Sequence, residues 1–272
     1  MSFLGTLKSD FRRAVFSWHF LFSALLVAVV YISSGYYEFN YNFKNNYDVA
    51  TMFNFLHNVG TYVTMIILSS TFCYSSSFCT DWQEKSIFPY AIRSGQKNYC
   101  CSKVLSCAFA GGIAPVLGLL LFIISLSFFF PLLDERGGLF GSAIDQINGT
   151  TSYACLMPVV ISKNGPLYFF LLLYLVFLVC AFWAVVGLTV SAIVPNKFVA
   201  IFSPYLIFFL ESLFLRNTPL LKTSSIMVGN FNFGLGVFGN ICFVTLIIGF
   251  LIFLLGVFFT YMVKRKLANE TV

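Results

Sequence analysis

The chain has 272 residues, of which 59% are hydrophobic and only 10% are charged, and its mean hydropathy is +0.88. A soluble domain could not keep so much apolar surface away from water, so we expect an integral membrane protein. The formal net charge of +6 is attributed to basic residues that set the orientation of the protein in the membrane. Nothing besides that charge supports a nucleic-acid partner.

Six continuous apolar runs are long enough to cross a bilayer as helices, since a hydrocarbon core about 30 Å thick needs roughly 20 residues. The runs do not alternate with a period of two, which favours helices over strands. We therefore expect an all-α fold with one membrane domain over residues 1–272. The predicted spans are about 14–34, 55–77, 104–130, 167–191, 198–214 and 240–263.

The basic residues are distributed unequally between the two sides of these spans. With the N-terminus inside, the inner segments hold 11 of the 16 Lys and Arg residues and the outer loops hold 5. The positive-inside rule then places both termini and the loop 78–103 in the cytoplasm of a multi-pass protein of the cell membrane.

The segment 1–13 is amphipathic at helical spacing. Phe3, Leu7 and Phe11 fall on one stripe, while Asp10 and the neighbouring basic residues point elsewhere. This pattern predicts a helix that lies in the inner membrane interface before the first span. The alternative is a merely basic N-terminal flank.

The sequence offers little for catalysis or for cofactor and metal binding. Gly234, Gly236 and Gly239 form a G-x-G-x-x-G pattern, but that fingerprint needs a soluble βαβ unit and here opens a membrane helix. The histidines His19 and His57 have no acid close in sequence, and no Cys/His spacing suits zinc. We therefore expect no enzyme activity, cofactor or metal in this chain.

Glu211 is the only acid inside a predicted span, where a charge costs about 2.5–3.5 kcal/mol at mid-depth. It either faces a polar pathway, pairs with Arg216, or lies near the outer interface. Pro204 in the same span is expected to bend its helix. The bend would be either a functional hinge or a feature of helix packing without a role in function. The interrupted apolar segment 215–239 is expected to dip into the outer leaflet.

The loop 78–103 between the second and third spans contains six of the chain's 26 charged residues. Thr80 and Gln83 have the spacing of a capping box, which predicts the start of a helix. The segment Trp82–Ile92 would then be a short amphipathic helix parallel to the membrane. Its mixture of exposed apolar and charged side chains suits docking by a soluble partner.

Over nearly its whole length the chain resembles the permease subunits of bacterial type 2 ABC exporters. The resemblance includes the amphipathic N-terminal segment, the six spans and the inner loop. In that family the loop contains an acid, a Gly, an apolar stretch, a basic residue, and then Tyr and Lys. Ser86 stands in place of the Gly here, and the matching positions are Glu84, Ile87, Phe88, Arg93, Tyr99 and Lys103.

This resemblance implies that the loop is a cytoplasmic coupling helix seated on a separate ABC-type ATPase subunit, which binds ATP and Mg²⁺. It also implies a second permease chain, identical or homologous, and a pathway formed by the first, second and fifth spans. The cargo would be an amphipathic peptide, a drug or a lipid-like molecule. The residues that dock on the ATPase would be Asp81, Trp82, Glu84, Ile87, Phe88 and Arg93.

Two other functions are compatible with the same sequence. One is a secondary carrier driven by an ion gradient, although the scarcity of charges within the spans favours another energy source. The other is a membrane scaffold or sensor subunit that transports nothing. In both cases the loop would be an ordinary basic connection.

Overall fold

The computed structural model describes residues 3–45, 48–58, 61–89, 95–135, 138–140, 155–215 and 222–270, and within these ranges it contains helices and no strand. The helices are α1 (Phe3–Val15), α2 (Trp18–Asn45), α3 (Val49–Asn58), α4 (Thr61–Tyr74), α5 (Ser77–Gln83), α7 (Gln96–Ser127), α9 (Met157–Ile161), α10 (Gly165–Ile193), α11 (Lys197–Phe214), α12 (Thr223–Val228) and α13 (Gly236–Glu270).

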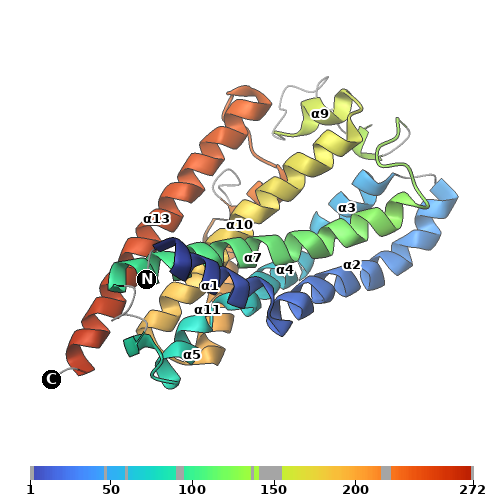
Figure 1. The fold of residues 1–272 in the computed structure, drawn as a ribbon. Helices are drawn as coiled ribbons and strands as arrows, with labels where there is room; N and C mark the ends of the chain where they lie inside the picture. Colours follow the sequence, from blue (N-terminus) through green and yellow to red (C-terminus); the bar gives the residue numbers. More distant parts are fainter. Residues whose placement is uncertain are drawn as a thin grey trace.

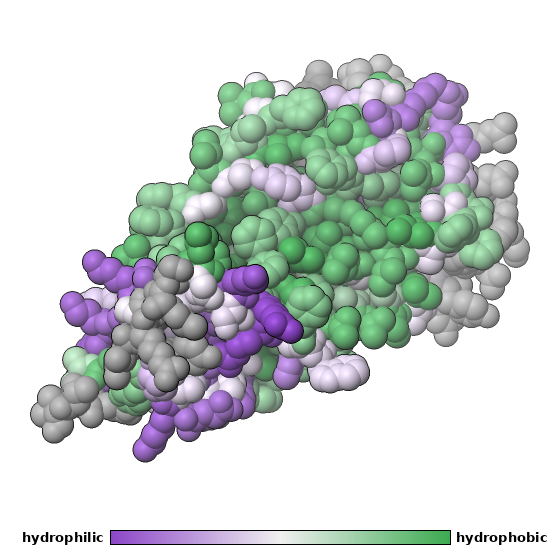
Figure 2. Space-filling view, in the orientation of Figure 1, coloured by the Kyte–Doolittle hydropathy of each residue, from purple (hydrophilic) through white to green (hydrophobic). Residues whose placement is uncertain are grey.

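Six helical segments in the described part are long and apolar enough to cross a membrane: α2, α4 with α5, α7, α10, α11 and α13. This agrees with the prediction of an all-α membrane protein: the described residues are largely helical and include six helical segments that could span a membrane. The helices α1 and α5 and the end of α13 lie toward one end of the molecule, and α3 and α9 lie toward the other (Figure 1). Hydrophilic residues gather near both ends, with an apolar band between them (Figure 2).

Several predicted span boundaries differ from the structure, among them those of the second and third spans. The third helix begins at Gln96 rather than at about 104, so Tyr99 and Lys103 belong to α7 and not to the loop. The region predicted as the second span is divided between α3 and the continuous stretch of α4 and α5. The helix can include the buried Lys103 because the carboxylates of Asp10 and Asp81 lie next to its ammonium group.

Helix α10 lies at the centre of the bundle and packs against α4, α7, α11 and α13. In the membrane window of α10, 72% of the residues are buried, whereas only 17% are buried in the windows of α11 and α13. A helix that is apolar on all sides suits both a protein core and a lipid environment. The difference in burial therefore shows which helices remain open to lipid or to another chain.

Glycines allow the backbone of α7 to approach its neighbours closely. A Cβ at Gly111 would lie 2.3 Å from the Cβ of Ala184 in α10, and one at Gly118 would lie 2.5 Å from the Ala24 carbonyl oxygen of α2. Small residues at such crossings increase van der Waals contact where no hydrophobic effect drives helices together. Helix α7 is thus fixed tightly between α2 and α10.

Gly118→Ala is expected to destabilise the bundle by about 1–3 kcal/mol, because the added methyl group overlaps the α2 backbone. The thermal unfolding midpoint of the purified protein in detergent measures this loss. The matched control is Gly249→Ala in α13, where a Cβ meets no atom within 4 Å. Equal midpoints for the two variants would show that the close approach does not matter.

Candidate functional site

A cluster of charged and hydroxyl side chains lies where α1, α4, α5 and α7 meet. We call this cluster the charged junction. It connects the loop after the second span with the N-terminal helix and the third span. Its members are Asp10 and Arg13 of α1, Tyr74 of α4, Asp81 of α5, and Tyr99, Ser102 and Lys103 of α7.

Asp81 is the centre of the charged junction. Its carboxylate accepts hydrogen bonds from the Lys103 ammonium at 2.7 Å, the Arg13 guanidinium at 3.2 Å and the Tyr99 hydroxyl at 2.8 Å. Arg13 binds Oδ1, and the other two groups bind Oδ2. Asp81 has no exposed surface, so these three donors replace the water that an ionised carboxylate otherwise requires.

Lys103 is also completely buried, although it lies in a membrane-length helix. Besides Asp81, its ammonium contacts the Asp10 carboxylate at 3.6 Å and donates to the Tyr74 hydroxyl at 3.2 Å. A lysine ammonium has three N–H groups, so these three oxygens match its donors. The formal charges of the two acids and two bases cancel, which allows the lysine to remain buried.

Helix α1 reaches the charged junction through a narrow buried stripe. Its buried residues are Thr6, Asp10 and Ala14, which recur every four residues and face α7. Asp10 accepts a further hydrogen bond from the Ser102 hydroxyl at 2.5 Å. The apolar side chain of Leu4 is 74% exposed, as expected for a helix with an outer face in contact with lipid. The position of α1 in the membrane interface stays a prediction.

The turn after α5 is exposed on the side away from the junction. Glu84 caps the helix, and Lys85 has a left-handed φ of 54°, which ends the helical path. Both side chains are exposed, and those of Trp82 and Phe88 are partly buried. The Lys266 ammonium of α13 lies 5.3 Å from the centre of the Trp82 ring. We call the surface formed by Trp82, Glu84, Lys85 and Phe88 the loop surface.

The structure separates the six predicted docking residues into three groups. Glu84 and the two aromatic residues lie on the loop surface. Asp81 and Ile87 have no exposed surface, so the expectation that they face a partner is corrected. Asp81 is held by cations from two other helices, and Ile87 packs in the apolar cluster beneath the loop. Arg93 lies outside the described residues.

The predicted start of the loop helix is wrong. Helix α5 begins at Ser77 and ends at Gln83, close to the point where the capping box suggested a beginning. The Thr80 hydroxyl donates to a carbonyl one turn earlier instead of capping a new helix. The Asp81 carboxylate, near the end of α5, binds side chains of α1 and α7. Residues 90–94 lie outside the described part.

The sequence interpretation missed the partners of Asp81. Lys103 was matched only to the lysine of the family's loop, and Asp10 was placed away from the apolar stripe of the first helix. A signal for Asp10 was present, because Thr6, Asp10 and Ala14 form a stripe of small or polar residues at helical spacing. The indication for Lys103 was weaker. It lies at the start of a long apolar run with little charge, where a buried lysine needs an acidic partner.

Glu211 links α11 to the segment between the fifth and sixth spans. Its carboxylate accepts hydrogen bonds from the backbone N–H and the hydroxyl of Thr223, each at 2.7 Å. It therefore caps the first turn of α12, where N–H groups lack helical partners. Pro204 is buried in α11, and Arg216 lies outside the described residues. A role for Glu211 or Pro204 in a pathway stays a prediction.

The charged side chains of the junction are paired with one another. Each charged group is occupied by an opposite charge or a hydroxyl group within the cluster. In the described part of the chain, no group of three or more His, Cys, Asp or Glu side chains is placed to hold a metal ion. The geometry connects three segments that are distant in the sequence through buried ion pairs and hydrogen bonds.

Lys103→Met is expected to lower the free energy of unfolding by about 3–5 kcal/mol, because two buried carboxylates lose their shared cation. The double variant Lys103→Met/Asp81→Asn should recover part of this loss, since opposite charges leave together. Thermal unfolding in detergent measures both. Lys97→Met, at an exposed position of the same helix, is the control. A loss as large for Lys97→Met as for Lys103→Met would contradict this role of the junction.

No family model, no curated protein and no solved structure matches this chain.

Proposed function

We propose that this chain is the permease subunit of an ATP-driven exporter and that an ABC-type ATPase subunit docks on its loop surface. The observation that carries the proposal is the charged junction directly behind that surface. A connection between two spans needs no buried cluster of four charges, which is costly to assemble. An element that receives force from a partner needs a stiff attachment to the membrane helices, and the junction would provide it.

A push on the loop surface would pass into several membrane helices. Lys103 joins the loop to α7, and α1, which carries two more junction residues, leads directly into α2. The turn before α5 is attached to α10, because the Ser75 hydroxyl donates to the Ala184 carbonyl at 3.1 Å. Closure of two partner ATPases would then rock these helices between inward-open and outward-open arrangements.

The proposed partner chain and cargo follow from the family resemblance and from the exposed apolar helices. Only 17% of the residues in the membrane window of α11 are buried, so lipid, cargo or another chain must cover the rest. We propose that a second permease chain, identical or homologous, packs there. The cargo would be an amphipathic peptide, a drug or a lipid-like molecule, carried across a bacterial cell membrane, and the ATPase subunit would supply the site for ATP and Mg²⁺.

An ion-coupled carrier is the second candidate, and the buried charges favour it. Asp81 and Lys103 are the kind of ionisable groups that proton-coupled transporters bury. They lie in the last turn of α5 and the third turn of α7, however, and thus near helix ends, whereas carriers bind coupling ions near the bilayer midplane. The position of the cluster favours the ATP-driven exporter.

The double change Glu84→Arg/Phe88→Ala should weaken association with the ATPase subunit about tenfold, because it reverses a charge and removes an aromatic anchor. The measurement is the amount of an ATP-hydrolysing subunit with a phosphate loop that co-purifies in mild detergent. Glu135→Arg, an exposed acid at the opposite end, is the control. Unchanged association for the loop variant, with normal membrane insertion, would rule out docking there.

The paired change Asp81→Asn/Lys103→Met should separate docking from transport. The ATPase subunit should still bind, because the loop surface is unaltered, but ATP-dependent transport in vesicles should fall severalfold as the stiff attachment is lost. Full ATP-dependent transport by this variant would contradict the proposed path of force. Transport by the unaltered chain without nucleotide, driven by a proton or sodium gradient, would instead establish the carrier.

A further inference from the structure

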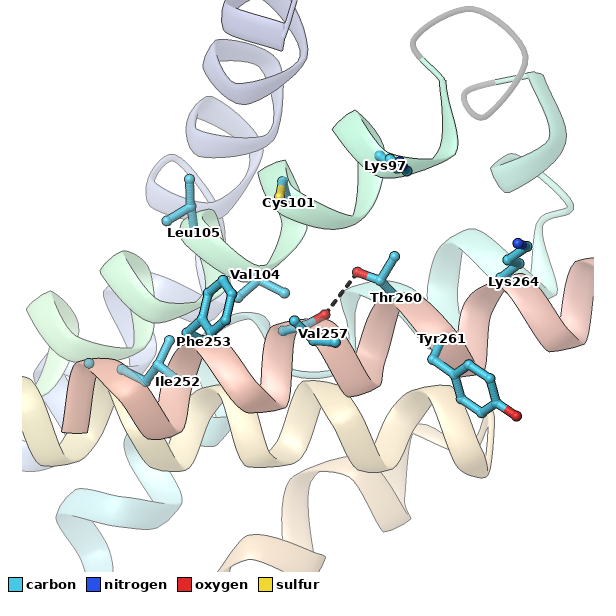
Figure 3. Close-up of a pocket in the computed structure, with 12 residues that line it drawn as sticks. Lys97, Cys101, Val104, Leu105, Ile252, Phe253, Val257, Thr260, Tyr261 and Lys264 are labelled. Carbon is cyan, nitrogen blue, oxygen red and sulfur yellow. Dashed lines mark hydrogen bonds between the residues drawn. The ribbon is translucent and has the colours of Figure 1, made fainter. Parts of the chain in front are cut away.

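A groove lies between α7 and α13, on a side of the molecule that the charged junction does not use. It has a volume of about 630 Å³ and is lined by the first turns of α7 and by the second half of α13. Figure 3 shows Leu105 and Phe253 toward one end of the groove, and Lys97 and Lys264 toward the other. The two ends therefore differ in chemistry.

Two glycines shape the floor of the groove. Gly249 and Gly256 are seven residues apart on α13, so they lie on the same face of the helix. A Cβ at Gly249 would meet no atom within 4 Å, and one at Gly256 would lie 3.5 Å from a methyl group of Val104. The Thr260 hydroxyl donates to the Gly256 carbonyl at 2.8 Å, so its donor is already used. This part of the groove suits an apolar chain.

The other end of the groove is basic. Lys97 and Lys264 are both exposed, and within the described part of the chain neither forms an ion pair. Tyr261, which is 59% exposed, also lines the groove one turn before Lys264, and tyrosines are common at membrane interfaces. An anionic group at this end of the groove would not have to displace a carboxylate from either ammonium group.

The length of the groove matches one leaflet of a bilayer. An α-helix rises about 1.5 Å per residue, so Gly249 and Lys264 are about 22 Å apart along α13. Half of a bilayer with its headgroups is about 20–22 Å thick. An acyl chain over the glycines would therefore place its headgroup near the lysines.

We propose that this groove binds an anionic phospholipid from the leaflet at the α5 end, with its phosphate between Lys97 and Lys264 and an acyl chain over Gly249 and Gly256. Basic pockets between membrane helices on the cytoplasmic side recognise such headgroups. A second copy of the chain is a poorer occupant, because a two-fold contact there would bring like-charged lysines together. This inference needs the membrane orientation only and does not depend on an ATPase partner.

The test uses the full chain reconstituted in vesicles of equal parts phosphatidylglycerol and phosphatidylcholine, extracted in mild detergent and weighed intact by native mass spectrometry. The unaltered protein should retain phosphatidylglycerol in preference. Lys97→Gln/Lys264→Gln should reduce that preference about tenfold, because each lysine near an anionic surface contributes favourably. Gly249→Leu/Gly256→Leu should remove bound lipid of both kinds, since its side chains fill the groove.

The matched control is Lys85→Gln/Arg265→Gln, which removes two exposed charges at the same end but outside the groove. This control should retain phosphatidylglycerol like the unaltered protein. If it loses as much as the lysine pair in the groove, or if the leucine variant is folded and still retains the lipid, the proposal is wrong. Oxidative cross-linking of two copies through Cys101, which lines the groove, would also overturn it.

Discussion

The contact between Asp81 and Lys103, 2.7 Å long and inaccessible to solvent, determines much of the architecture at one end of this protein. Each ion would cost several kcal/mol to bury alone, so the pair is stable only with further partners. Those partners come from α1, which must therefore lie against α7 instead of extending the line of α2. The chain turns at Ser17, whose hydroxyl accepts a hydrogen bond from the N–H of Phe20 at the start of α2.

The bundle above this contact presents two kinds of surface. Helix α10 is largely enclosed by protein and is joined to α7 by a close backbone approach, whereas α11 and α13 expose long apolar faces. Helix α7 continues directly from the charged junction, which would let a displacement of the loop reach the middle of the membrane. The open helices are left for lipid, for a second chain and for cargo. In our proposals, movement of the loop is transmitted through α7, whereas lipid, cargo or a second chain binds at α11 and α13.

The six spans could be predicted because a bilayer imposes length and apolarity on each span, and both are local properties of the sequence. The charged junction could not be predicted in the same way. Asp81 and Arg13 are separated by 68 positions, and nothing local indicates that they meet. The capping-box interpretation failed because Thr80 lies inside α5, which begins at Ser77, and its hydroxyl donates to the Ser76 carbonyl. Glu211 found its partner at Thr223, beyond the end of its own helix, which composition alone could not indicate.

The central claim is that the loop surface moves together with α7. It is tested most directly by the distance between spin labels at Glu84 and Lys97, measured in the assembled complex with and without ATP. We expect one narrow distribution that is the same in both states, while the distance from Glu84 to Lys197 at the start of α11 changes. A broad or nucleotide-dependent distance between Glu84 and Lys97 would show that the loop moves independently of α7, and would contradict the account.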